Sequence, residues 1–186
     1  YESVAIITKQ LSQAHTTALI HQASQAYQTQ INELLLAALT QTITVWSGHA
    51  DVVLQLEGHG REELDQPLDL SQTVGWFTTL FPIKLSLPQQ QSPKNLIKQI
   101  KEQVRAIPER GIGYGLLRSI DSALQAMPTP AISFNYFGQL DQTLQASGLF
   151  STVPESTGTA VFPQRRREQL LAINCQVLAS QLQIEW

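Results

Sequence analysis

The stretch Glu57-Gly58-His59-Gly60-Arg61-Glu62 is rich in ionisable side chains, including residue types that acid and base catalysis uses. The stretch follows an apolar, β-branched run from Asp51 to Leu56, which predicts a buried strand. If the extended backbone continues past this run, Glu57, His59 and Arg61 point to one face, because side chains alternate along a strand. A sheet needs no such group for stability, so a carboxylate there is solvated, paired or used in chemistry.

Each of these side chains has a structural interpretation beside the chemical one. Glu57 can be a general acid or base, or it can pair with Arg61 or a lysine at the strand end. Partial burial would favour its protonated form, whereas Arg61 nearby would favour the carboxylate. Arg61 can hold substrate, order the Glu57 carboxylate through two hydrogen bonds, or be a solvated loop residue. For His59, between two glycines, we favour a backbone-anchored orienting role over direct catalysis.

The elements that position these residues follow from periodicity and capping signals. We expect strands over 4–7, 51–57, 83–87 and 131–137, a C-terminal hairpin over 169–186 that turns at Ala179-Ser180, and helices after Ser12, over 29–46, from Ser92 to Pro108 and over 111–120. A polar connection over 62–73 and a loop-rich excursion over 138–159 join them. The apolar stripes of the first two helices contain Ala18, Leu19, Ala23 and Ala26, and then Ile31, Leu34, Leu35, Ala38, Leu39 and Ile43. This order predicts one α/β domain over residues 1–186, a two-layer sandwich with helices on one face of a mixed β-sheet.

Other candidate residues have simpler interpretations. Trp76 and Phe77 are predicted to be core residues, and Cys175 a buried structural thiol. By alternation, one of Asn135 and Tyr136 faces a channel and the other the interior. The basic stripe on the third helix and a run of arginines are predicted to be solvated, with contact to an acidic partner as the alternative; these residues are Lys94, Lys98, Lys101, Arg105 and Arg165 to Arg167.

Bulk properties exclude several classes of protein. The hydrophobic content of 42% is typical of a globular domain, and a net charge of −3 gives no basis for binding nucleic acid. We find no apolar run long enough for a membrane span, and a lone cysteine suits a reducing, cytoplasmic location. No histidine or cysteine has ligand spacing from another, so we predict no metal site. The glycines over 111–115 lack the spacing of a nucleotide-binding loop. The chain opens without methionine in a strand-like run, so we expect a fragment.

Five segments, taken in order, resemble the later motifs of the epimerization domain of nonribosomal peptide synthetases, a member of the condensation-domain superfamily. They are INELLLAAL (31–39), EGHGRE (57–62), TVGWFTTLFP (73–82), IPERGIGYG (107–115) and FNYFGQ (134–139), and the similarity spans Thr29 to Trp186. The resemblance implies the C-terminal lobe of a chloramphenicol-acetyltransferase-like fold, in which two lobes form a V around a channel. The N-terminal lobe is absent from this chain.

The resemblance also implies a reaction, the inversion of the α-carbon of an aminoacyl or peptidyl thioester from L to D by proton transfer. Glu57 would be one acid/base, and a histidine of a His-His-x-x-x-Asp-Gly motif in the other lobe would face it. That motif is not in this chain, where the histidines are solitary, so we expect no turnover by this lobe alone; they are His15, His21, His49 and His59.

The resemblance assigns further residues and partners. Tyr136 would be catalytic, Asn135 would line the channel with it, and His59, Arg61 and Trp76 would contact substrate. A carrier protein would supply the phosphopantetheine arm, and no cofactor would be bound directly. The alternatives are a condensation-domain lobe that forms peptide bonds, although such members generally lack EGHGRE, and a non-catalytic docking or scaffold lobe.

Overall fold

The computed structural model describes residues 4–62, 69–87, 92–139, 158, 162 and 164–186 of the chain. Within these residues the strands form one six-stranded sheet in the order β1-β6-β5-β4-β2-β3. The strands are β1 (Thr8–Gln10), β2 (Asp51–Gly58), β3 (Thr79–Ser86), β4 (Ile132–Gln139), β5 (Leu171–Leu178) and β6 (Gln181–Glu185).

The sheet is mixed. β2 pairs in parallel with β4, and β4 in parallel with β5, whereas the other neighbours are antiparallel. The carboxyl ends of β2, β4 and β5 therefore meet at one edge, which is where ligands commonly bind in sheets of this kind.

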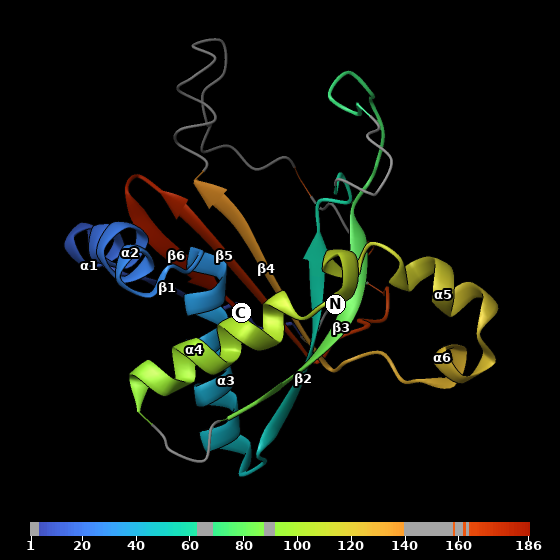
Figure 1. Cartoon of the computed structure of the whole chain (residues 1–186), viewed down its shortest axis with the longest axis horizontal. Helices are drawn as coiled ribbons and strands as arrows, with labels where there is room; N and C mark the ends of the chain where they lie inside the picture. The colour runs from blue at the N-terminus through green and yellow to red at the C-terminus, as the bar shows by residue number, and fades with distance from the viewer. Residues whose placement is uncertain (1–3, 63–68, 88–91, 140–157, 159–161, 163) are drawn as a thin grey trace.

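The helices lie on one face of this sheet and at its side (Figure 1). α3 and α4 cross the face, and α5 and α6 lie beside β3. The helical segments are α1 (Gln13–Thr17), the π-helix η1 (Ala18–Ala23), α2 (Ser24–Tyr27), α3 (Ile31–Ser47), α4 (Pro93–Arg105), the 3₁₀ turn η2 (Pro108–Gly111), α5 (Tyr114–Ile120) and α6 (Ser122–Ala126). The predicted fold class, a mixed sheet with helices on one face, is confirmed.

The core lies between the sheet and its helices because alternate strand residues point that way. In β2, Leu54 is fully buried between its exposed neighbour Val53 and the buried Gln55. Leu36 of α3 and Ile100 of α4 meet this layer. The alternation leaves every second side chain of β2, including Glu57, on the face without helices.

Several local predictions are confirmed. Ser12 and Ser92 cap their helices with side-chain oxygens, and Pro93 opens α4. Ala179 and Ser180, both with positive φ, make the tight turn of the β5–β6 hairpin. Cys175 is buried, and burial raises the pKa of its thiol to about 11.

Other local predictions are wrong for physical reasons. Residues 4–7 are not a strand: β1 starts at Thr8, and of these four residues Ile7 alone has backbone hydrogen bonds to the end of the hairpin, at Trp186. The π-helical turn shifts the phase of the first helix and leaves Ala26 exposed. Ala38 is also exposed, because α3 buries its Leu36 and Ala37 side. The helix expected over 111–120 starts at Tyr114, and α6 follows it after the capping residue Asp121.

The basic stripe of α4 divides into two parts. Lys94 and Lys98 are exposed, as predicted. Lys101 instead is largely covered and contacts the carbonyl of Tyr27, so the solvated interpretation is wrong for it. Arg105 is exposed and also binds a buried carboxylate. Arg165 to Arg167 are exposed. Most of the excursion predicted over 138–159, and residues 63–68 of the polar connection, lie outside the described residues. In the part of the chain that the structure describes, no helix has the length and apolar character needed to cross a membrane.

Candidate functional site

The site is built where β2 ends beside β4. Glu57 is the penultimate residue of β2, opposite Leu80 of β3, and its side chain is exposed on the face without helices. Because β2 and β4 are parallel, Glu57 reaches the same edge of the sheet as the end of β4. The strand thus delivers a carboxylate to the edge where the parallel strands finish.

Gly60 ends the alternation of the strand. Its φ is +67°, and a Cβ atom there would lie 1.6 Å from the carbonyl oxygen of Phe77. No other residue fits without moving the backbone. The chain therefore turns, and the extended geometry that would place Glu57, His59 and Arg61 on one face does not persist; each of the three has a different partner.

The partner of Glu57 is the amide of Asn135. Asn135 lies in β4, and its Nδ2 donates to Glu57 Oε2 at 2.7 Å. A hydrogen bond of this kind fixes the position of the carboxylate and comes from a neutral group. No ion pair involves Glu57 within the described residues, so the interpretation as a salt-bridged strand end is wrong.

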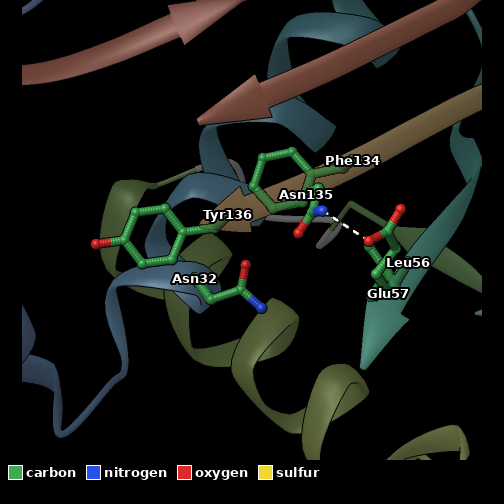
Figure 2. Close-up of a pocket in the computed structure, with 6 residues that line it drawn as sticks. All are labelled: Asn32, Leu56, Glu57, Phe134, Asn135 and Tyr136. Carbon is green, nitrogen blue, oxygen red and sulfur yellow. Dashed lines mark hydrogen bonds between the residues drawn. The ribbon is translucent and has the colours of Figure 1, made fainter. Parts of the chain in front are cut away.

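A pocket of about 130 Å³ opens next to this pair. Its lining combines the polar residues Asn32, Glu57 and Asn135 with the apolar or aromatic residues Leu56, Phe134 and Tyr136 (Figure 2). Asn135 and Tyr136 alternate as predicted, since Asn135 bonds Glu57 and Tyr136 packs against the core.

Tyr136 contributes a neutral phenol. Burial, with a smaller contribution from Cys175, raises the pKa of Tyr136 above its ordinary value, so the hydroxyl stays protonated at neutral pH. Figure 2 shows this hydroxyl pointing away from Glu57 and Asn135. In this arrangement Tyr136 offers the pocket its ring.

Arg61 braces the turn after the strand. Its guanidinium donates to the carbonyls of Leu70 at 2.5 Å and Thr73 at 2.7 Å. The same group lies 4.1 Å from the centre of the Phe77 ring, a cation–π contact. Arg61 therefore organises residues 70–77 in this structure, and it does not touch Glu57.

His59 belongs to a second cluster. Its Nδ1 accepts from the backbone N–H of Arg61 at 3.0 Å, and its Nε2 lies 3.0 Å from Glu62. The Glu62 carboxylate, 10% exposed, also binds Arg110 at 3.1 Å. This cluster ties the turn after β2 to η2.

Trp76 is 90% exposed, so its predicted place in the core is wrong. The exposed Val74 beside it in sequence shows that this stretch runs over the surface, whereas Phe77 is partly covered by Arg61. The structure does not place Trp76 among the residues that line the pocket.

Two residues of the site were missed by the sequence analysis. Asn32 lines the pocket from the first turn of α3, and Glu62 anchors the turn. Both occur inside the segments INELLLAAL (31–39) and EGHGRE (57–62). In the sequence, the signal that could have identified them was a polar side chain inside each of these two segments. In the described part of the chain, no three His, Cys, Asp or Glu side chains are grouped to hold a metal ion.

Comparisons with known proteins place this site in context. The family model described as Condensation domain matches residues 3–184. A linear gramicidin synthase of Brevibacillus parabrevis is 41% identical over 181 residues, which are 95% of this chain but only 4% of that protein. The crystal structure of the epimerization domain from the third module of tyrocidine synthetase B matches with a TM-score of 0.85 and 35% identity, over 99% of this chain and 42% of that one. The first condensation domain of the CDA synthetase matches with a TM-score of 0.60 and 14% identity, over 97% of this chain and 38% of that one, which shows a shared fold.

Proposed function

The chain belongs to the condensation-domain family, and from this premise we propose that it is the C-terminal lobe of an epimerization domain in a nonribosomal peptide synthetase. The proposed reaction inverts the α-carbon of an aminoacyl or peptidyl thioester carried by a carrier protein. The observation that carries the proposal is the Glu57 carboxylate, held by a neutral amide beside a pocket at the carboxyl edge of the parallel strands.

Two further observations support epimerization over peptide-bond formation. The stretch EGHGRE at 57–62 resembles an epimerization-domain motif that condensing members generally lack. Identity is 35% to an epimerization domain and 14% to a condensation domain of the same fold. Formation of peptide bonds is thus the second candidate, and a non-catalytic scaffold is the third.

The geometry suits removal of a proton from carbon. A thioester α-carbon is a weak acid, so the base must be ionised, positioned and next to space for the substrate. Asn135 supplies the position of the Glu57 carboxylate, and the pocket supplies the space. Glu57 accepts the α-proton while the electron pair of the C–H bond moves into an enolate whose charge lies on the thioester oxygen.

The reaction needs partners beyond this chain. The chain spans 42% of the epimerization domain to which it is similar, and we propose that the remaining lobe faces the pocket. An acid on that lobe, a histidine by the resemblance, returns a proton to the opposite face of the α-carbon. The phosphopantetheine arm of the carrier brings the thioester as substrate, and His59, Arg61 and Trp76 remain candidates for contact with it.

Replacement of the carboxylate by an amide tests the proposal. In the two-lobed protein, Glu57→Gln should lower the rate of α-deuterium wash-out from carrier-bound alanyl, leucyl and phenylalanyl thioesters at least about 100-fold, as expected for loss of a positioned base. Mass spectrometry measures the wash-out. Glu102→Gln, an exposed residue of α4, is the matched control and should keep the wild-type rate.

Two results would contradict the proposal. Wild-type protein that exchanges no α-deuterium but condenses two carrier-bound substrates would favour the second candidate. Undiminished exchange by folded Glu57→Gln protein would remove Glu57 from the mechanism.

A further inference from the structure

Asn32 presents a side-chain amide to the pocket. It is the second residue of α3, is partly buried and lines the pocket together with Glu57 and Asn135. Figure 2 shows the amide extending from α3 into the space between Tyr136 and Glu57. Among the residues that the structure describes, none is hydrogen-bonded to this side chain.

Removal of an α-proton by Glu57 would be assisted by a hydrogen-bond donor of this kind. Removing the α-proton places negative charge on the thioester oxygen, and a hydrogen-bond donor aimed at that oxygen stabilises the transition state. Of the residues that line the pocket, Leu56 and Phe134 have no side-chain donor. Asn135 uses one of the two N–H groups of Nδ2 to hold Glu57, so its amide is committed to positioning the carboxylate.

The lining residues whose donors are not committed to Glu57 are Tyr136 and Asn32. The hydroxyl of Tyr136 points away from the Glu57 carboxylate, whereas the amide of Asn32 extends into the space between Tyr136 and Glu57 (Figure 2). Asn32 lines the same pocket as Glu57, and no described residue is hydrogen-bonded to its amide, so it is the donor available to a thioester oxygen.

The backbone of Asn32 is also held rigidly. The next residue, Glu33, is buried, and its carboxylate accepts from Arg105 Nε at 2.6 Å and from the backbone N–H of Gln30 at 2.8 Å. These bonds fix the first turn of α3 against α4. A donor on such a turn does not need to reorganise during the reaction, which is the condition for strong electrostatic catalysis.

We propose that Asn32 is a second catalytic residue, whose side-chain amide donates a hydrogen bond to the thioester oxygen as Glu57 removes the α-proton. The role rests on the proposed function. In the step, the proton passes from the α-carbon to the Glu57 carboxylate, the C–H electron pair forms the carbon–carbon double bond of the enolate, and the carbonyl π pair moves to the oxygen that Asn32 binds. The reverse movement of these electrons accompanies reprotonation.

Two substitutions separate this role from a structural one. Asn32→Ala removes the donor, and we expect about a 100-fold fall in kcat for α-deuterium wash-out with a much smaller change in KM. Asn32→Asp has the same shape but presents a carboxylate that accepts and does not donate at neutral pH. An acidic residue in the first turn of a helix is favourable, so this variant should keep its Tm and lose at least as much kcat.

The experiment uses the two-lobed protein with α-deuterated alanyl, leucyl and phenylalanyl thioesters on the carrier, below the Tm of each variant as measured by circular dichroism. Asn95→Asp is the matched control, because Asn95 lies in the first turn of α4 and should keep wild-type kcat. Wild-type kcat in folded Asn32→Asp, with Glu57→Gln inactive, would overturn the role of Asn32 and leave the proposed function standing. Failure of the wild-type protein to exchange deuterium would overturn both.

Discussion

Glu33 and Glu57 are two carboxylates of the same fold with opposite surroundings. Glu33, on α3, is 5% exposed, and Arg105 of α4 binds both of its oxygens. Glu57, at the end of β2, is exposed and held by one neutral amide. The first carboxylate is paired with a cation and ties two helices together, whereas the second lies next to a pocket without a cationic partner among the described residues. The two carboxylates thus differ in whether the partner that holds them is a cation or a neutral amide.

A third carboxylate, at the start of β2, forms an ion pair on the surface. Asp51 pairs with Lys84 of β3 at 2.7 Å, and both side chains remain well exposed to solvent. Hydrogen bonds from Lys84 and Ser86 lower the pKa of Asp51 below its ordinary value. This pair is a surface ion pair, of the kind that contributes little to stability. The same strand therefore begins with an acid paired to a cation and ends with an acid held by an amide.

The largest effect on stability should come from breaking the buried pair. Arg105→Ala leaves the Glu33 carboxylate buried without its guanidinium, and we expect a loss of about 2 kcal/mol in the free energy of unfolding. The loss is below that of a fully buried pair because Arg105 is 48% exposed. Urea denaturation measures it, with the exposed Lys98→Ala on the same helix as control.

A second variant makes this result specific. Glu33→Gln in the Arg105→Ala background removes the stranded charge and should recover part of the lost stability. Glu57→Gln alone should leave the unfolding midpoint unchanged. Equal stability losses from Glu57→Gln and Arg105→Ala would contradict the claim that the Glu33 carboxylate stabilises the fold and the Glu57 carboxylate does not.

An intermediate effect, on rate, is expected at the partner of Glu57. Asn135→Ala removes the hydrogen bond that positions the carboxylate. Losing a hydrogen bond to a charged group costs about 1.4 kcal/mol, which corresponds to a tenfold fall in kcat. Asn135→Asp should fall further, because it places a like charge beside Glu57. Deuterium wash-out in the two-lobed protein gives both values. A full wild-type rate for Asn135→Ala would mean that the strand alone positions Glu57.

The smallest effect is expected from Lys84→Ala. The folded-state pKa of Asp51 lies below the unfolded value of 3.8. The contribution of the pair to stability is therefore complete above pH 3.8 and is lost as the pH falls through the folded-state pKa. The variant should therefore differ slightly from wild type at pH 7 in low salt. The difference should vanish in 1 M salt or near pH 2. Thermal unfolding across this pH range is the measurement, and a large, salt-resistant difference at pH 7 would contradict the assignment as a surface pair.

Local signals made much of the fold predictable from the sequence. Ser92-Pro93 marks a helix start through capping and a missing N–H, and these depend only on neighbouring residues. The β5–β6 hairpin was predictable because its alternation continues on both sides of the turn. The π-helical turn at Ala18–Ala23 was not, because no residue type demands it.

Glu57 became a candidate acid through its place after a predicted strand and the resemblance of the segment EGHGRE, whereas its neighbours in space were harder to predict. Its bond to Asn135 joins positions 78 residues apart and depends on the parallel pairing of β2 with β4. Asn32 enters the pocket because α3 starts at the same edge, which periodicity does not reveal. Trp76 was misplaced because a large aromatic residue is usually buried, and nothing local marks an exposed one.

Pro82 lies within β3, the outer strand of the described sheet, opposite Gln55. A proline has no N–H to offer, and the exposed Lys84 beside it would have to be desolvated by any strand that approached. A second polypeptide that added a strand at the β3 edge would therefore find the row of backbone hydrogen-bonding groups interrupted at Pro82. The lobe carries its own resistance to edge-to-edge aggregation, through residues separate from those that surround Glu57.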